Sequence, residues 1–170
     1  MAPSVEHRAA PRRAALLAWM MIPACAESSA EPPPAPVFPE DVSGWAEGRA
    51  CMLSHEHELR YIRVLVDDAA AVPYRELDAE HPYDVGATLL KLEYDDADCT
   101  SLVGYTAVQK QPPGYSLHGH DWRWQRVDVD RNVVEDGELP VCITCHNHHC
   151  TPALCGNPGC GYDLTCGVEP

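Results

Sequence analysis

The sequence predicts a mainly β protein of the α+β class, built on an antiparallel sheet with a few short helices. Several short runs rich in β-branched and aromatic residues lie between residues 59 and 134, and such runs indicate strands. Turn-forming residues separate these runs at short spacing, which is typical of an antiparallel sheet.

The predicted elements follow one another in a simple order. Residues 45–58 mix Gly, Ala and charged residues and are expected to be helical, and residues 67–77 are rich in Ala and predict another helix, which Pro73 limits. Trp122 and Trp124 lie on one face of their strand, where we expect them to pack in the core. The predicted strands are residues 59–66, 86–94, 102–110, 122–129 and 133–134.

Composition limits both the core and the partners. The only Phe, Phe38, lies in a Pro-rich stretch, so we expect the core to consist of Val, Leu, Ile, Tyr and the tryptophans Trp45, Trp122 and Trp124. The formal net charge of the 170-residue chain is −14. Such a chain repels nucleic-acid phosphates and anionic headgroups, so neither is an expected partner, whereas a basic redox partner or a small neutral or cationic substrate fits.

The N-terminus predicts export. Three arginines between positions 8 and 13 precede an apolar run over residues 14–22, and small residues lead from there to Cys25. This is the layout of a secretory signal peptide, here residues 1–24, and the apolar run is too short to span a bilayer.

The residues at the cleavage point predict lipidation. The segment Ile22-Pro-Ala-Cys25 resembles a bacterial lipobox, whose Cys carries the lipid and becomes the new N-terminus. The residue after Cys25 is Ala26 and not Asp, which in lipobox proteins favours attachment to the outer membrane over the inner membrane. Secretion into the periplasm without a lipid is the alternative. Residues 25–43 are expected to form a lipidated, Pro-rich tether, so the lipid anchor is the only expected membrane contact.

A motif near the C-terminus carries the chemistry: Cys142-Ile-Thr-Cys145-His146. Two thiols one helical turn apart can bond both vinyl groups on one edge of a porphyrin, and the following His can bind the iron as proximal ligand. The motif therefore predicts covalently attached haem c, held by Cys142, Cys145 and His146. A zinc site built from the motif and the His and Cys residues that follow it is the alternative.

The remaining cysteines predict disulfides. Export places them in an oxidising compartment, and an even number suits three disulfides. We favour a Cys51–Cys99 disulfide within the domain. The other four cysteines are expected to form disulfides that stabilise residues 147–170, which make up a Cys-rich C-terminal tail. The six candidates are Cys51, Cys99, Cys150, Cys155, Cys160 and Cys166.

The sixth ligand of the iron is not evident. Once the signal peptide is removed the only Met is Met52, well upstream of the motif, so the usual His/Met site of electron-transfer cytochromes lacks its Met. A His, a Lys or an open position is left, and an open position favours gas binding or catalysis over simple electron transfer.

An ordered set of segments within about residues 80–146 resembles the cytochrome P-460 family. Residues 54–63 also resemble a lipoprotein-like subset of that family. The matching segments are residues 86–93 with Lys91, 104–110 (GYTAVQK), 113–115 (PGY), 121–124 (DWRW) and 137–146, which ends in the haem motif.

The resemblance implies both a fold and an activity. Family members are mostly β proteins, often homodimers, so residues 44–146 are expected to form such a haem domain and a homodimer. Some members oxidise hydroxylamine or nitric oxide and use a Lys that is cross-linked to the porphyrin; Lys91 matches this Lys. Relatives called cytochrome c′-beta bind NO or CO without the cross-link.

Together these features predict a periplasm-facing haem oxidoreductase of small nitrogen compounds that passes electrons to an acceptor cytochrome. The alternatives are a non-catalytic gas-binding cytochrome and a structural lipoprotein held by zinc or disulfides. His118 and His120 are candidates for the distal iron ligand, but we expect them to lie in a solvated loop. His55 and His57 could form a metal site, but we expect them to lie in an ordinary polar segment. The candidate proton relays are Glu93, Asp121 and Glu135.

Overall fold

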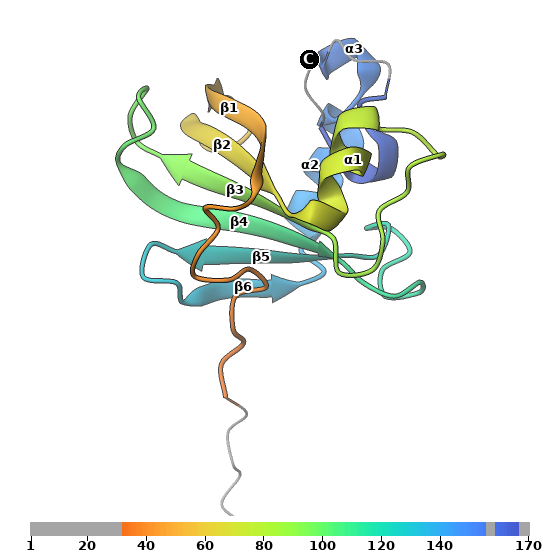
Figure 1. Ribbon diagram of the computed structural model, residues 1–170, viewed down its shortest axis with the longest axis horizontal. Helices are drawn as coiled ribbons and strands as arrows, with labels where there is room; N and C mark the ends of the chain where they lie inside the picture. The colour runs from red at the N-terminus through yellow and green to blue at the C-terminus, as the bar shows by residue number, and fades with distance from the viewer. Residues whose placement is uncertain (1–31, 156–158, 167–170) are drawn as a thin grey trace, which may run out of the picture. The chain divides into compact units, whose positions relative to one another are not determined.

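Six strands form one antiparallel sheet, in which each strand pairs with the next along the chain (Figure 1). The computed structural model describes residues 32–155 and 159–166. The strands are β1 (Ala46–Ser54), β2 (Arg60–Val66), β3 (Thr88–Tyr94), β4 (Leu102–Lys110), β5 (Trp122–Asp128) and β6 (Val133–Gly137). The predicted mainly β fold with an antiparallel sheet is confirmed.

Short helices lie against one face of this sheet (Figure 1). The Asp67 carboxylate accepts a hydrogen bond from the Ala70 amide at 2.9 Å and so caps the first of them. Among the described residues, no helix is long and apolar enough to cross a membrane. The helices are α1 (Asp68–Glu76), α2 (Pro140–His149), α3 (Pro152–Cys155) and the 3-10 helix η1 (Tyr162–Leu164).

Alternate residues of the strands form two separate cores. Val64, Trp122 and Trp124 are buried on the helical face, beside residues of α1, α2 and η1, so the prediction for the two tryptophans is confirmed. Leu65 is buried on the opposite face, where it belongs to one cluster with Phe38. This division follows from the pleat of a strand, which points successive side chains to opposite faces.

The segment before β1 covers the face opposite the helices. Phe38 is only 3% exposed, and its ring centre lies 5.2 Å from that of Tyr105 on β4. The buried Gln125 side chain accepts a hydrogen bond from the Val37 amide at 2.8 Å. The expectation of a core without Phe38 is therefore wrong. No described helix covers this face of the sheet, and part of the Pro-rich segment covers it instead.

Residues 45–58 are not helical as expected. They form β1 and the turn that leads to β2. The pairing of β1 with β2 is irregular between Glu47 and Arg49 and again between Arg49 and Met52, and such bulges interrupt the alternation of side chains. β1 is also a mostly exposed edge strand. Its sequence therefore lacks the regular apolar alternation that identifies a strand.

The residues after the haem motif belong to the folded domain. Leu164 and Thr165 are buried, and Asp163 forms an ion pair with Lys110 of β4, with a distance of 2.5 Å between Oδ2 and Nζ. The Trp122 indole donates a hydrogen bond to the Asp163 carbonyl at 2.8 Å. These contacts hold residues 159–166 against the helical face of the sheet.

Disulfides fasten both the edge strand and the C-terminal segment. Cys51 of β1 is joined to Cys99 in the turn after β3, which is the pair that the sequence favoured. Cys150 is joined to Cys166, and Cys160 is also disulfide-bonded.

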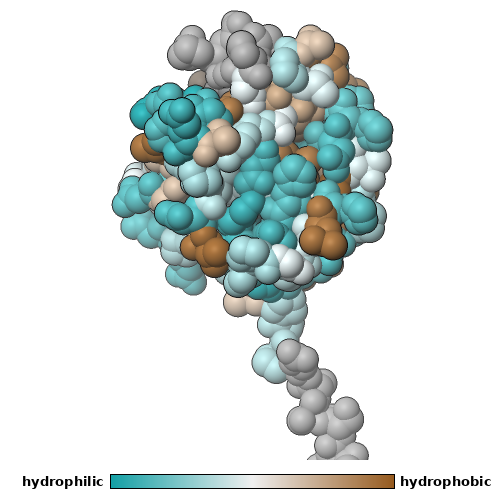
Figure 2. Space-filling view, turned by 90° about the vertical axis from the view of Figure 1, so that its right-hand side faces the viewer, coloured by the Kyte–Doolittle hydropathy of each residue, from teal (hydrophilic) through white to brown (hydrophobic). Residues whose placement is uncertain are grey.

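The face shown in Figure 2 is mostly hydrophilic, and its apolar residues are scattered over it. Scattered apolar residues of this kind are normal on a protein surface and need no partner to cover them.

Candidate cofactor site

The Cys142-Ile-Thr-Cys145-His146 motif lies on α2, where its spacing places the two thiols one helical turn apart. Pro140 is the first residue of the helix, a position that needs no amide hydrogen. Cys142 and Cys145 are three residues apart and therefore lie on one side of the helix. Both are free thiols and partly buried, and burial raises the pKa of Cys142. They are the only free thiols among the cysteines whose side chains the structure describes.

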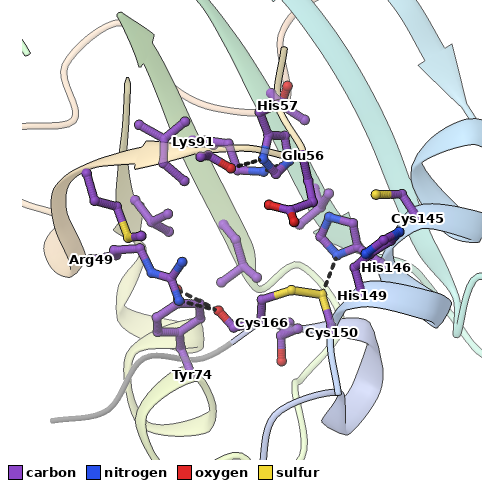
Figure 3. Close-up of a pocket in the computed structure, with 18 of the residues that line it drawn as sticks. Arg49, Glu56, His57, Tyr74, Lys91, Cys145, His146, His149, Cys150 and Cys166 are labelled. Atoms are coloured by element: carbon purple, nitrogen blue, oxygen red, sulfur yellow. Dashed lines mark hydrogen bonds between the residues drawn. A yellow bond between two sulfur atoms is a disulfide. The ribbon is translucent and has the colours of Figure 1, made fainter. Parts of the chain in front are cut away.

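A cavity of about 430 Å³ opens beside α2 (Figure 3). This volume falls within the range of small-molecule sites, about 300–1,000 Å³. Strand residues on the helical face of the sheet supply much of its apolar wall. Its polar wall includes Arg49, Glu56, His57, Lys91, Cys145, His146 and His149.

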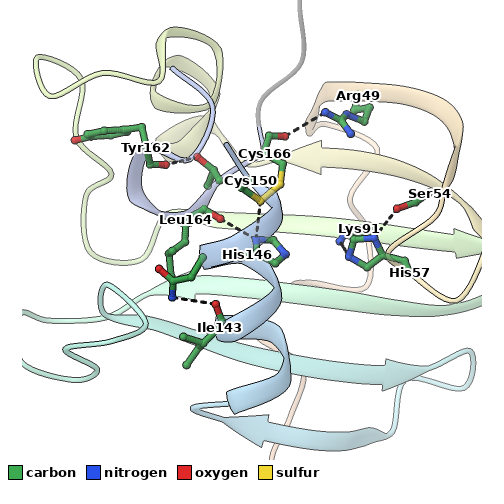
Figure 4. The surroundings of a disulfide bond; sticks show 12 residues. Arg49, Ser54, His57, Lys91, Ile143, His146, Cys150, Tyr162, Leu164 and Cys166 are labelled. Carbon is green, nitrogen blue, oxygen red and sulfur yellow. Dashed lines mark hydrogen bonds between the residues drawn. A yellow bond between two sulfur atoms is a disulfide. The ribbon is translucent and has the colours of Figure 1, made fainter. Parts of the chain in front are cut away.

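The His146 ring is fixed in orientation and in tautomer (Figure 4). Its Nδ1 lies 2.7 Å from the Leu164 carbonyl oxygen, and since a carbonyl can only accept, Nδ1 carries the hydrogen. The Trp124 ring stands against it edge to face, with ring centres 4.7 Å apart. Nε2 is thus left with a free lone pair, the arrangement found for metal-binding His residues.

The His146 ring is neutral at physiological pH. Burial lowers its pKa to about 4, with a further contribution from the charge of Lys91. A neutral imidazole is the form that binds a metal.

Lys91 points into the cavity from β3 (Figure 3). The sequence alone did not show on which face of the sheet this side chain lies. It pairs with Val64 of β2 in the sheet, and its Nζ contacts Nε2 of His57. Burial lowers the pKa of Lys91 to about 8, although the nearby Glu93 carboxylate opposes the shift. The amine is therefore neutral far more often than that of a solvated Lys.

His57 belongs to this site, contrary to the expectation of a plain polar segment. It lies in the turn between β1 and β2, and its Nδ1 is 2.6 Å from the Ser54 hydroxyl oxygen. Burial lowers its pKa to about 3, with Lys91 the next cause. The alternation of His and Glu over residues 55–58 was the available signal, but it does not distinguish the half-buried His57 from the exposed His55.

Arg49 closes the opposite side of the cavity, and nothing in the sequence singled it out. Its Nη2 donates a hydrogen bond to the Cys166 carbonyl at 3.2 Å. The bond joins β1 to the segment that also holds His146.

The other candidates from the sequence do not line the cavity. His120 lies 3.3 Å from a carboxylate oxygen of Asp163. Asp121 accepts backbone hydrogen bonds within its own loop, and Glu135 pairs with Arg126 on the surface. Glu93 accepts a hydrogen bond from Thr106, a residue of the cavity wall.

The alternative of a zinc site finds weak support. Among the described residues, ligand atoms of His146, Cys150 and Cys166 lie within 4.8 Å of one another. A cysteine binds zinc as a thiolate, however, and these two sulfur atoms are bonded to each other in a disulfide. The free thiols of Cys142 and Cys145 belong to no such group among the described residues.

Comparison with protein-family models and with curated proteins found no match to this chain. The resemblance to the cytochrome P-460 family therefore stays a prediction, and the case for a function depends on the site itself.

Proposed function

We propose that this chain is an exported c-type haem protein that oxidises a small nitrogen compound, hydroxylamine or nitric oxide. The observation that carries the proposal is one turn of α2 at the edge of a cavity. It holds two free thiols and a neutral imidazole whose Nε2 has no hydrogen-bond partner among the described residues.

These residues fit haem c. Cys142 and Cys145 would form the thioether bonds, and His146 would bind the iron through Nε2. The other described cysteines are paired, so two thiols left free in an oxidising compartment favour a covalent partner other than sulfur. When bound, haem supplies a one-electron redox centre.

The remaining polar residues of the cavity suit an oxidation that releases protons. Glu56 and Lys91 line the cavity, and Lys91 has a pKa of about 8. A carboxylate beside a bound substrate can accept the protons that its oxidation releases. The net charge of −14 favours a basic acceptor cytochrome as the electron-transfer partner.

A gas-binding cytochrome is the second candidate. It is favoured by the apolar side chains in the cavity wall, among them Ile62, Val64 and Leu89. Such a wall suits small neutral ligands such as NO or CO.

The test is to produce the chain with a haem-maturation system and to measure its visible spectrum and its turnover of hydroxylamine. We expect haem that resists acid–acetone extraction and hydroxylamine-dependent reduction of a basic cytochrome. Extractable or absent haem would refute the proposal. Covalent haem that binds NO or CO without turnover would leave the gas-binding alternative.

A further inference from the structure

We propose that His57 binds the haem iron opposite His146 in the resting protein, so that a substrate or gas must displace it. The inference deepens the proposed function and depends on it, because it requires haem at His146.

The separation of the two imidazole rings carries the inference. The ring centres of His57 and His146 lie 6.4 Å apart, with the ring planes at 76° to each other. A metal–imidazole bond is about 2.0–2.1 Å long and the ring centre lies roughly 1.1 Å behind the nitrogen, so two imidazoles on opposite sides of one metal ion have centres about 6.2–6.4 Å apart. The observed spacing is that of two axial ligands, and it leaves no room for a substrate between the iron and His57.

Hydrogen bonds engage Nδ1 of each ring, and the Lys91 amine engages Nε2 of His57. The Leu164 carbonyl accepts from Nδ1 of His146, and Ser54 lies against Nδ1 of His57. Nε2 of His57 faces the amine of Lys91. Figure 4 shows the edge of the His146 ring away from Leu164 turned toward this Lys91–His57 pair. With haem bound, the iron would take the place of the Lys91 amine at Nε2 of His57.

Other candidate ligands in the cavity wall suit the position less well. His149 lies on α2, the helix that carries His146 itself, and its side chain is exposed. Met52 is 41% exposed on the edge strand. Lys91 contacts His57 directly, so it lies beside the proposed ligand.

The location of His57 would allow displacement. It lies in the turn between β1 and β2 and is part of neither strand. Its backbone carbonyl accepts one turn hydrogen bond, from the Arg60 amide at 3.0 Å. The ring can therefore move away from the iron without loss of the hydrogen bonds between strands.

The test compares the full-length haem-loaded wild type with His57→Ala and with the matched control His55→Ala, whose side chain is exposed in the same turn. We expect a low-spin, six-coordinate spectrum for the wild type and for His55→Ala, and a high-spin spectrum for His57→Ala. Free imidazole should return His57→Ala to low spin. CO should bind His57→Ala about 10- to 100-fold more tightly, because the competent state is no longer a minor one.

Three other outcomes would contradict the proposal that His57 binds the iron. Wild type with covalent haem but a high-spin spectrum would exclude His57 as ligand and leave the proposed function intact, as would a His57→Ala variant that stays low-spin. Wild type without haem would remove both proposals. If His57→Ala does not fold, the CO-binding rate of the wild type decides: it should saturate at high CO when ligand release limits it, and a linear dependence contradicts the inference.

Discussion

The orientation of His146 depends on a residue 18 positions further along the chain, because the Leu164 carbonyl accepts its Nδ1 hydrogen. Leu164 is itself buried, and the Cys150–Cys166 disulfide closes the segment around it. The motif predicted which ring would bind iron. It could not predict which group fixes that ring, because the contact is set by tertiary packing.

At the same scale, the sequence identified Lys91 but did not single out its neighbour. Lys91 was singled out through the resemblance to a family. His57 was named only together with His55, and the sequence could not separate the two because the contacts of His57 depend on a turn that brings Ser54 and Lys91 to its two nitrogens. Arg49 was invisible, since it contacts the cavity through a hydrogen bond to the distant Cys166 carbonyl.

Lys91 supports the first prediction, a cross-link to the porphyrin. Its amine is buried at the cavity, with a pKa lowered to about 8, and a neutral amine is the nucleophilic form. The new C–N bond replaces a C–H bond of the porphyrin and releases two electrons and two protons, so the link forms only where a two-electron oxidant such as hydrogen peroxide is supplied. Under the enzyme hypothesis, the Lys91 peptide remains joined to the haem peptide in tryptic mass spectrometry of the wild type. Lys91→Arg should separate the two and reduce hydroxylamine oxidation by about 100-fold, the scale of a misplaced reactive group.

The matched control is Lys110→Arg, because Lys110 is the only other Lys and forms an ion pair with Asp163. It should leave the linked peptides unchanged. A free Lys91 peptide from the wild type, together with a conventional Soret band, would contradict the cross-linked enzyme and favour the gas-binding alternative.

At the scale of elements, β2 to β5 were predictable because their residues alternate or form compact apolar runs between turn residues. β6 was predicted too short, over residues 133–134, because the rest of this edge strand, Glu135 to Gly137, is polar and has no apolar pattern. β1 was missed for a related reason, since its bulges and exposed residues leave no period to detect.

The pairing of β6 with β5 supports a prediction about pH. Arg123 donates hydrogen bonds to both carboxylate oxygens of Asp136, at 2.7 and 2.5 Å, and these bonds hold the pKa of Asp136 below its usual value of 3.8. The pair therefore contributes stability at neutral pH that is lost as the pH falls below that value. We expect Asp136→Asn to lower the free energy of unfolding by about 1 kcal/mol at pH 7.

Urea denaturation measures this difference, which should shrink as the pH falls below 3.8. Glu135→Gln is the control on the same strand. Its partner Arg126 has 47% of its side chain exposed and Glu135 has 44%, so we expect a change below about 0.5 kcal/mol. Equal effects of the two substitutions, or a difference for Asp136→Asn that does not depend on pH, would contradict this account of β6.

At the scale of the whole molecule, the folded domain is longer than residues 44–146, the range expected from the resemblance. Phe38 on one face and Leu164 on the other are both buried. Neither segment has a pattern that predicts packing, because each contributes only a few apolar side chains to a sheet formed by other parts of the chain.

The N-terminal prediction also concerns the molecule as a whole and lies outside the described residues. Mass spectrometry of the mature protein from a bacterial host should find a diacylglyceryl group on Cys25 as the first residue. Cys25→Ala should move the protein from the membrane fraction to the periplasmic fraction. An unmodified mature chain that begins at another residue would rule out the lipid anchor.

Covalent haem on α2 is the central claim, and the mass of the intact, denatured protein tests it most directly. We predict that the wild type carries the mass of one haem in excess of its polypeptide and that Cys142→Ala/Cys145→Ala does not. Cys51→Ala/Cys99→Ala, which removes a disulfide between β1 and the turn after β3, should keep the haem. A wild type with the mass of the polypeptide alone, or a Cys142→Ala/Cys145→Ala variant that retains the haem, would contradict the claim.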